Sequence, residues 1–85
     1  MIDKTIIMHN IPVTDFTLQL PSGFEFLRVG ESPGGGLAMW FEVNPHATLT
    51  NVEFNVEPEG GRVEPRRKYL GSALSPPLFV YEVLR

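Results

Sequence analysis

The sequence predicts an all-β protein, built as a small sandwich or partly open barrel of about seven short, mostly antiparallel strands. Eight glycines and eight prolines divide its 85 residues into stretches that are too short for ordinary helices. In several of these stretches, apolar and polar residues alternate with the period of two that is typical of half-buried strands. No helical periodicity extends beyond a turn or two, and no internal repeat occurs. We therefore expect residues 1–85 to form a single all-β domain.

The first half of the chain contains four expected strands, which turns rich in proline and glycine separate. In the second of these, Phe16, Leu18 and Leu20 alternate with polar residues, as in a strand with one buried face. The fourth is the clearest core strand, because every second residue from Leu37 to Val43 is apolar. The four strands are expected at residues 4–10, 16–20, 24–29 and 37–44.

Three further strands are expected in the second half, at residues 52–57, 68–73 and 78–84. In the first of these, Glu53, Asn55 and Glu57 alternate with apolar residues, so one of its faces is acidic. The last is apolar on both sides, which predicts either a central place in the fold or burial against a second subunit. This strand favours a homodimer.

Composition excludes several classes of protein. A net charge of −3 argues against direct binding to duplex nucleic acid, which favours a basic surface. The absence of cysteine excludes disulfides, a thiolate nucleophile and cysteine-based zinc sites. The longest apolar run, Leu37 to Phe41, is far shorter than the roughly 20 residues of a membrane helix. We expect a cytoplasmic protein without a cofactor, a metal or a membrane span.

No arrangement of residues indicates catalysis, and so short a chain has little room for a deep catalytic cleft. His9 and His46 lie far apart in the sequence and show no metal-ligand spacing. The carboxylates of Glu53 and Glu57 are about 13 Å apart along one strand, too far for the acid pair of a glycosidase. Only carboxylates from neighbouring strands could change this, so we expect a protein that is not an enzyme.

Several segments together resemble a family of small phage and prophage proteins that is known only as a domain of unknown function. The resemblance is carried by the segments Leu20-Pro21-Ser22-Gly23, Phe26-Leu27-Arg28-Val29, Leu37-Ala38-Met39-Trp40-Phe41-Glu42-Val43, Asn44-Pro45 and Tyr69-Leu70-Gly71-Ser72, with Phe79 and Tyr81 near the end. The family more often has aspartate where Asn44 stands, and a glycine-threonine-glycine turn where this chain has residues 57–61. The resemblance implies a phage origin and a small all-β fold, and it implies no activity.

Charge divides the chain into two regions of opposite sign. Residues 1–61 contain eight acids and two bases, a net charge of −6, whereas residues 62–85 contain five bases and two acids, a net charge of +3. Each region supplies one candidate surface. The acidic candidate, for a protein partner, consists of Glu53, Glu57 and Glu59 with Trp40, and the basic candidate, for an anionic ligand, consists of Arg66, Arg67, Lys68 and Tyr69.

Each candidate also has a purely structural interpretation. The acidic residues could form a solvated sheet face, and the arginines could pair with neighbouring glutamates in a solvated loop. Trp40 lies opposite the apolar side of its strand, so it belongs either to a second core layer, which we favour, or to an exposed aromatic anchor.

These observations lead to a hypothesis of non-catalytic binding in phage counter-defence. The acidic surface would dock onto a basic, nucleic-acid-handling host protein such as a CRISPR effector. Alternatively, the basic and aromatic residues would sequester a nucleotide immune signal. Net charge favours the protein partner. The alternative from another class is a virion or assembly component that associates through exposed strand edges.

Overall fold

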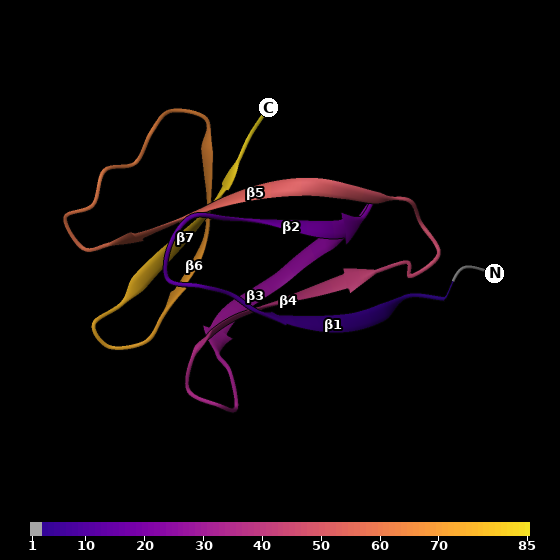
Figure 1. The fold of residues 1–85 in the computed structure, drawn as a ribbon, viewed down its shortest axis with the longest axis horizontal. Coiled ribbons are helices and arrows are strands. Elements are labelled where there is room, and N and C mark those ends of the chain that lie inside the picture. Colours follow the sequence, from indigo (N-terminus) through magenta and orange to yellow (C-terminus); the bar gives the residue numbers. More distant parts are fainter. Residues whose placement is uncertain (1–2) are drawn as a thin grey trace.

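The structure is a computed structural model that describes residues 3–85, and within that range it contains seven strands and no helix (Figure 1). The predicted all-β fold is confirmed. All strand pairs are antiparallel, and they form two sheets that do not close into a barrel. In chain order, the strands are β1 (Thr5–Asn10), β2 (Phe16–Pro21), β3 (Glu25–Glu31), β4 (Leu37–Val43), β5 (Leu49–Pro58), β6 (Arg67–Ala73) and β7 (Leu78–Val83).

The two sheets are interleaved in the sequence. The first sheet has the strand order β1-β4-β3, and the second has the order β2-β5-β7-β6. The chain passes from one sheet to the other after β1, after β2 and after β4. Two of these crossings lie together, because the N–H of Ser22 donates a hydrogen bond of 2.8 Å to the carbonyl oxygen of Thr48. This bond continues the pairing of β2 with β5 and holds the two connections together at one end of the sandwich.

The hydrophobic core lies between the sheets and is centred on Phe41 of β4, which is fully buried. The rings of Phe24, which directly precedes β3, and of Phe26 in β3 approach it edge-on, with centroids at 5.7 and 6.2 Å. Phe54 of β5 approaches it from the second sheet, at 6.2 Å. Edge-to-face contacts of this kind add to the stabilisation from burying the rings. The core consists of Ile11, Leu20, Leu37, Met39, Phe41, Val43, Val52, Phe54, Val56 and Val80.

The sheets also come together along one side, where β3 packs against β6. Gly71 of β6 lies so close to β3 that a Cβ atom there would be 3.2 Å from the Cβ of Val29. Both strands carry a β-bulge in this region, between Phe26 and Arg28 in β3 and between Tyr69 and Gly71 in β6. Because bulges bend and twist a strand, they allow these two edges to meet without merging into one sheet.

Strand β7 is internal to the second sheet, between β5 and β6. Its inward residue Val80 is fully buried, whereas the outward residues Phe79 and Tyr81 are half-buried. Of the two explanations for the apolar character of residues 78–84, the structure shows the central position. The position of β7 within the sheet accounts for its apolar residues without a second subunit. The homodimer therefore stays a prediction, without support from this strand.

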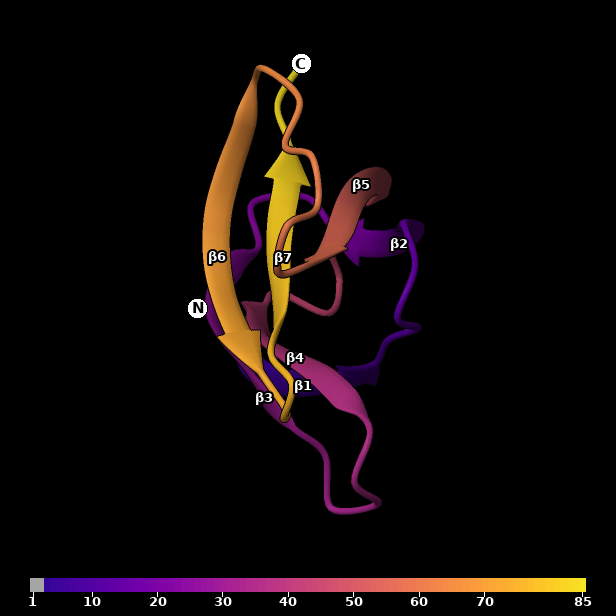
Figure 2. The ribbon, with the colours of Figure 1, turned by 90° about the vertical axis from the view of Figure 1, so that its left-hand side faces the viewer.

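The central position of β7 determines how β5 connects to β6. Since β7 is antiparallel to both neighbours, β5 and β6 are parallel, and parallel strands need a connection that returns along the sheet. Residues 59–66 make this return, from the end of β7 near Leu78 to the end near Val83, and we call them the crossover loop (Figure 2). The loop covers part of the outer face of β7.

Candidate functional site

The crossover loop begins with a tight turn at residues 58–61. The N–H of Gly61 donates a hydrogen bond of 2.9 Å to the carbonyl oxygen of Pro58. Gly60 has a φ of 82°, which a type II turn requires at its third residue and which glycine adopts without strain. A Cβ atom on Gly61 would lie 2.7 Å from Oε1 of Glu57. The turn therefore packs directly on the Glu57 side chain and limits the positions that its carboxylate can take.

A cavity of about 240 Å³ lies between the crossover loop and the outer face of the second sheet, and we call it the crossover pocket. Phe79 and Tyr81 of β7, with Val63 of the loop, give it an apolar lining. Glu57 and Glu59 also line it and supply two carboxylates. Glu57 is the cross-strand partner of Phe79, so the pairing of β5 with β7 brings this carboxylate and this ring onto one face.

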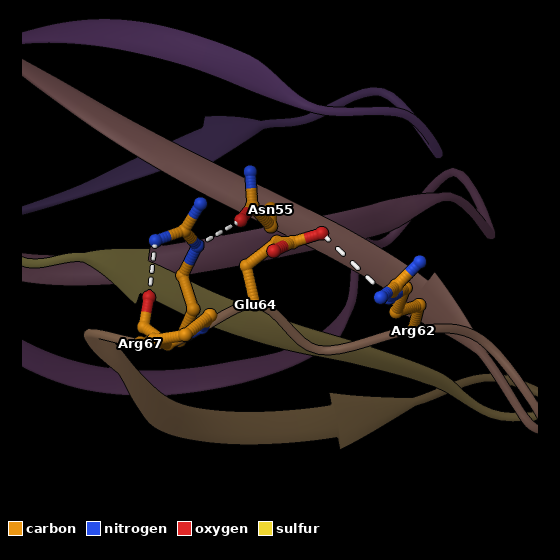
Figure 3. A network of polar contacts seen from close by, with 5 residues as sticks. Asn55, Arg62, Glu64 and Arg67 are labelled. Atoms are coloured by element: carbon orange, nitrogen blue, oxygen red, sulfur yellow. Dashed lines mark hydrogen bonds and ion pairs between the residues drawn. The ribbon is translucent and has the colours of Figure 1, made fainter.

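Arg67 holds the far end of the crossover loop. From the start of β6, its side chain reaches across β7 to β5, where its Nε donates a hydrogen bond to Oδ1 of Asn55 (Figure 3). Its Nη1 donates a second bond, of 2.8 Å, to the carbonyl oxygen of Pro65 in the loop. The guanidinium group is thus engaged within the protein, where it ties the crossover loop to the sheet.

The three predicted acidic residues lie on the second sheet's side of the molecule. Glu53 and Glu57 project from the outer face of β5, and Glu59 follows in the turn. The carboxylate of Glu53 pairs with the guanidinium of Arg85. Glu57 and Glu59 instead line the crossover pocket. The structure therefore brings two of the three acids to one cavity.

Trp40 is separated from these acids, because it lies on the outer face of the first sheet, where Met8 and Arg28 are its cross-strand neighbours. The guanidinium carbon of Arg28 lies 4.8 Å from the centroid of the indole ring. The indole also covers Gly30, where a Cβ atom would lie 3.2 Å from Cζ3. The favoured second core layer is wrong, because the described residues form one core and Trp40 lies half-buried outside it.

The four residues of the predicted basic and aromatic site do not share one surface. Arg66 is exposed at the end of the crossover loop, with a φ of 62°. Lys68 lines a separate cavity of about 390 Å³ on the other side of β6. Tyr69 projects from the outer face beside Arg67, and its ring lies 5.5 Å from that of Tyr81. Only Arg67 and Tyr69 share a face, and Arg67 is bonded within the protein.

Within residues 3–85, no group of three or more histidine or acidic side chains is arranged to hold a metal ion. His9 packs against the edge of the Phe41 ring, with centroids 6.1 Å apart. His46 is exposed in the turn after β4, where its N–H donates a hydrogen bond of 3.0 Å to Oδ1 of Asn44. The same range contains no helix of the length and hydropathy that crossing a bilayer would need.

Sequence reasoning did not assign a functional role to Phe79 and Tyr81, although both line the crossover pocket. The alternation around Val80 places the two rings on one side of their strand. The sequence contains no signal for the pairing of β7 with β5, and only this pairing places Phe79 opposite Glu57. The structure therefore adds Phe79 and Tyr81 to the candidate functional site.

Comparison with protein families places the chain by sequence. Residues 2–84 match a family described as a domain of unknown function, DUF7352. The chain belongs to this family. Membership in DUF7352 confirms the resemblance at the level of a domain of unknown function, and the phage or prophage origin stays a prediction. A search of curated proteins and of solved structures found no match to this DUF7352 chain.

Proposed function

We propose that this DUF7352 protein acts without catalysis, by binding a basic protein through the outer face of its second sheet. The observation that carries the proposal is the crossover pocket, where two carboxylates lie beside Phe79 and Tyr81. Carboxylates provide charge complementarity to a basic surface. Aromatic residues are enriched at the centres of protein interfaces, and tyrosine is among the residues that most often dominate the binding energy.

The charges around this face support an acidic surface. Two arginines extend toward it from β6 and from the end of the chain, and both are engaged within the protein. Arg67 donates to Asn55, and Arg85 pairs with Glu53. Glu57 and Glu59 have no such cationic partner among the ion pairs of residues 3–85. Their negative charge is therefore available to a partner.

The proposed setting is phage counter-defence in the host cytoplasm. The partner would be a nucleic-acid-handling immune protein, such as a CRISPR effector, whose basic groove the acidic face would occupy. The support for this setting is the small size of the chain, its acidic charge and its resemblance to phage and prophage proteins. Sequestration of a nucleotide has weaker support, because Lys68 lies on a different face from Arg67 and Tyr69.

Two variants with the same net charge test the acidic face. The first replaces Glu53, Glu57 and Glu59 by glutamine. The control carries Asp3→Asn, Glu25→Gln and Glu31→Gln, which lie outside this face. Each variant removes three negative charges and so changes the net charge from −3 to 0. Immobilised wild type and both variants would be incubated with host lysate, and the retained proteins would be identified and measured by mass spectrometry.

We expect wild type and control to retain the same basic protein, and the first variant to lose it. In cells with an active defence system, the wild type and the control should then restore phage plaques, and the first variant should not. Equal retention by both variants would contradict binding through this face. Regular assemblies of the chain, or its co-purification with virions, would instead support the structural alternative.

A further inference from the structure

We propose that the crossover pocket receives the side chain of a single arginine from the basic partner. The inference deepens the proposed function, on which it rests for the identity of the partner as a protein. It names one anchoring contact within an otherwise broad acidic face. Interfaces commonly depend on a few such anchors that fill pockets on the other protein.

The size of the pocket favours one side chain over a larger ligand. Its volume of about 240 Å³ is below the roughly 300–1,000 Å³ of pockets that hold drug-sized molecules. It lies on the outer surface, between the crossover loop and β7, where a residue projecting from a docked protein can enter. The crossover loop forms one wall of the pocket. The turn at residues 58–61 fixes one end of this loop, and the hydrogen bond from Arg67 fixes the other.

The chemistry of the lining favours a guanidinium group. Glu57 and Glu59 can accept its N–H donors, and a guanidinium binds carboxylates through a planar fork of two parallel bonds. Phe79 and Tyr81 give the lining two aromatic rings, and a planar cation is attracted to the face of such a ring. A neutral side chain of the same shape would stack on the rings and leave both carboxylates without a cation. The pocket is therefore specific for charge as well as for shape.

No lysine or arginine of residues 3–85 lines this pocket. Arg62 in the crossover loop is directed to Glu64, with 3.9 Å between its Nε and the carboxylate oxygen (Figure 3). Arg67 is bonded to Asn55, at the other end of the loop. Neither side chain belongs to the lining of the pocket.

Two short peptides test the inference directly, without the natural partner. The probes are acetyl-Gly-Arg-Gly-amide and the same peptide with citrulline, which keeps the planar shape of arginine and lacks its charge. Each would be titrated into the full chain while NMR resonances are followed. We expect the arginine peptide to shift the aromatic resonances of Phe79 and Tyr81 and the amide resonances of Gly60 and Gly61. The citrulline peptide should bind at least about tenfold more weakly.

Two single variants sharpen this test. Glu57→Gln should weaken binding of the arginine peptide about tenfold, because it removes a charged acceptor inside the pocket. Glu31→Gln is the matched control, because Glu31 is an exposed residue of β3 in the first sheet, outside both the acidic face and the pocket. It should leave binding unchanged. Equal binding of the two peptides, or no shift at the pocket resonances, would overturn the arginine site.

The two proposals can fail separately. If the acidic variant loses a host protein but the arginine peptide does not bind, the acidic face is correct and the arginine anchor is wrong. If the peptide binds but no host protein depends on the acidic face, the pocket recognises arginine and the proposed function is wrong.

Discussion

The outer faces of the two sheets both carry aromatic residues, and the protein covers them in different ways. On the second sheet, Phe79 and Tyr81 line the crossover pocket together with residues of the crossover loop, so another segment of the chain partly covers them. On the first sheet, Trp40 is shielded by a neighbouring side chain, because Arg28 stacks on its ring. A pocket lined with carboxylates forms on the second sheet.

The difference follows from strand order. Neighbouring strands β3 and β4 of the first sheet are joined by a hairpin, whose connection stays at the end of the strands. In the second sheet, β7 separates β5 from β6, so their connection must return over the sheet. A surface pocket in a chain of this size can thus result from a single strand placed between two others.

The largest loss of stability should come from Arg67→Met, which changes how the outer face of the second sheet is covered. The substitution keeps an apolar stem and removes the guanidinium that ties the crossover loop to β5. Hydrogen bonds to charged groups contribute about 1.5–3 kcal/mol each, and Arg67 is half-buried. Allowing for solvent screening, we expect a loss of about 2 kcal/mol in the free energy of unfolding. Chemical denaturation would measure it, and amide hydrogen exchange should show faster exchange in the crossover loop.

Lys68→Met is the matched control. Lys68 is the next residue on β6, but it lies on the other side of the strand and makes no hydrogen bond to the crossover loop among residues 3–85. We expect a change in stability below about 0.5 kcal/mol and unchanged exchange in the loop. Similar exchange in the two variants would show that Arg67 does not hold the loop.

Much of the fold was predictable, because alternation is a local property of the sequence. All seven strands were located, and the core face of β4 was assigned from every second residue between Leu37 and Val43. The main error in a boundary is at β5, which begins at Leu49 and not at residue 52. Residues 49–51 are exposed and belong to the strand because they pair with β2, so they carry no alternating pattern.

The candidate site was less predictable, because it depends on pairings between distant strands. The acids Glu57 and Glu59 were identified by their charge, but their aromatic neighbours required the register between β5 and β7. Trp40 and the acidic residues were assigned together on chemistry alone, and the strand order places them on opposite sides of the sandwich. The basic candidates do not share one face, because adjacent residues of a strand point to opposite faces.

A smaller effect is expected from Gly61→Ala, which tests how tightly the turn packs against Glu57. The added Cβ would lie 2.9 Å from the carbonyl oxygen of Pro58 and 3.1 Å from the Cβ of Glu57. Because backbone must move to relieve this contact, we expect a loss of about 1 kcal/mol, measured by chemical denaturation. Gly34→Ala is the control, since its nearest neighbouring atom would be 4.0 Å away. Equal stabilities of the two variants would show that the turn tolerates a side chain.

The smallest effect should come from the first sheet, where Arg28→Gln removes the cation above Trp40. A cation–π contact at an exposed site contributes about 0.5–1 kcal/mol, so the loss of stability should be close to 0.5 kcal/mol. The better measurement is fluorescence, because Trp40 is the only tryptophan in the chain. Loss of the guanidinium should expose the indole, shift its emission to longer wavelength and increase its quenching by acrylamide.

Lys4→Gln is the control, because Lys4 pairs with Glu42 at 3.7 Å without covering the indole. If both variants kept the wild-type emission, Arg28 would not be what shields Trp40, and the contrast between the two outer faces would depend on the crossover loop alone.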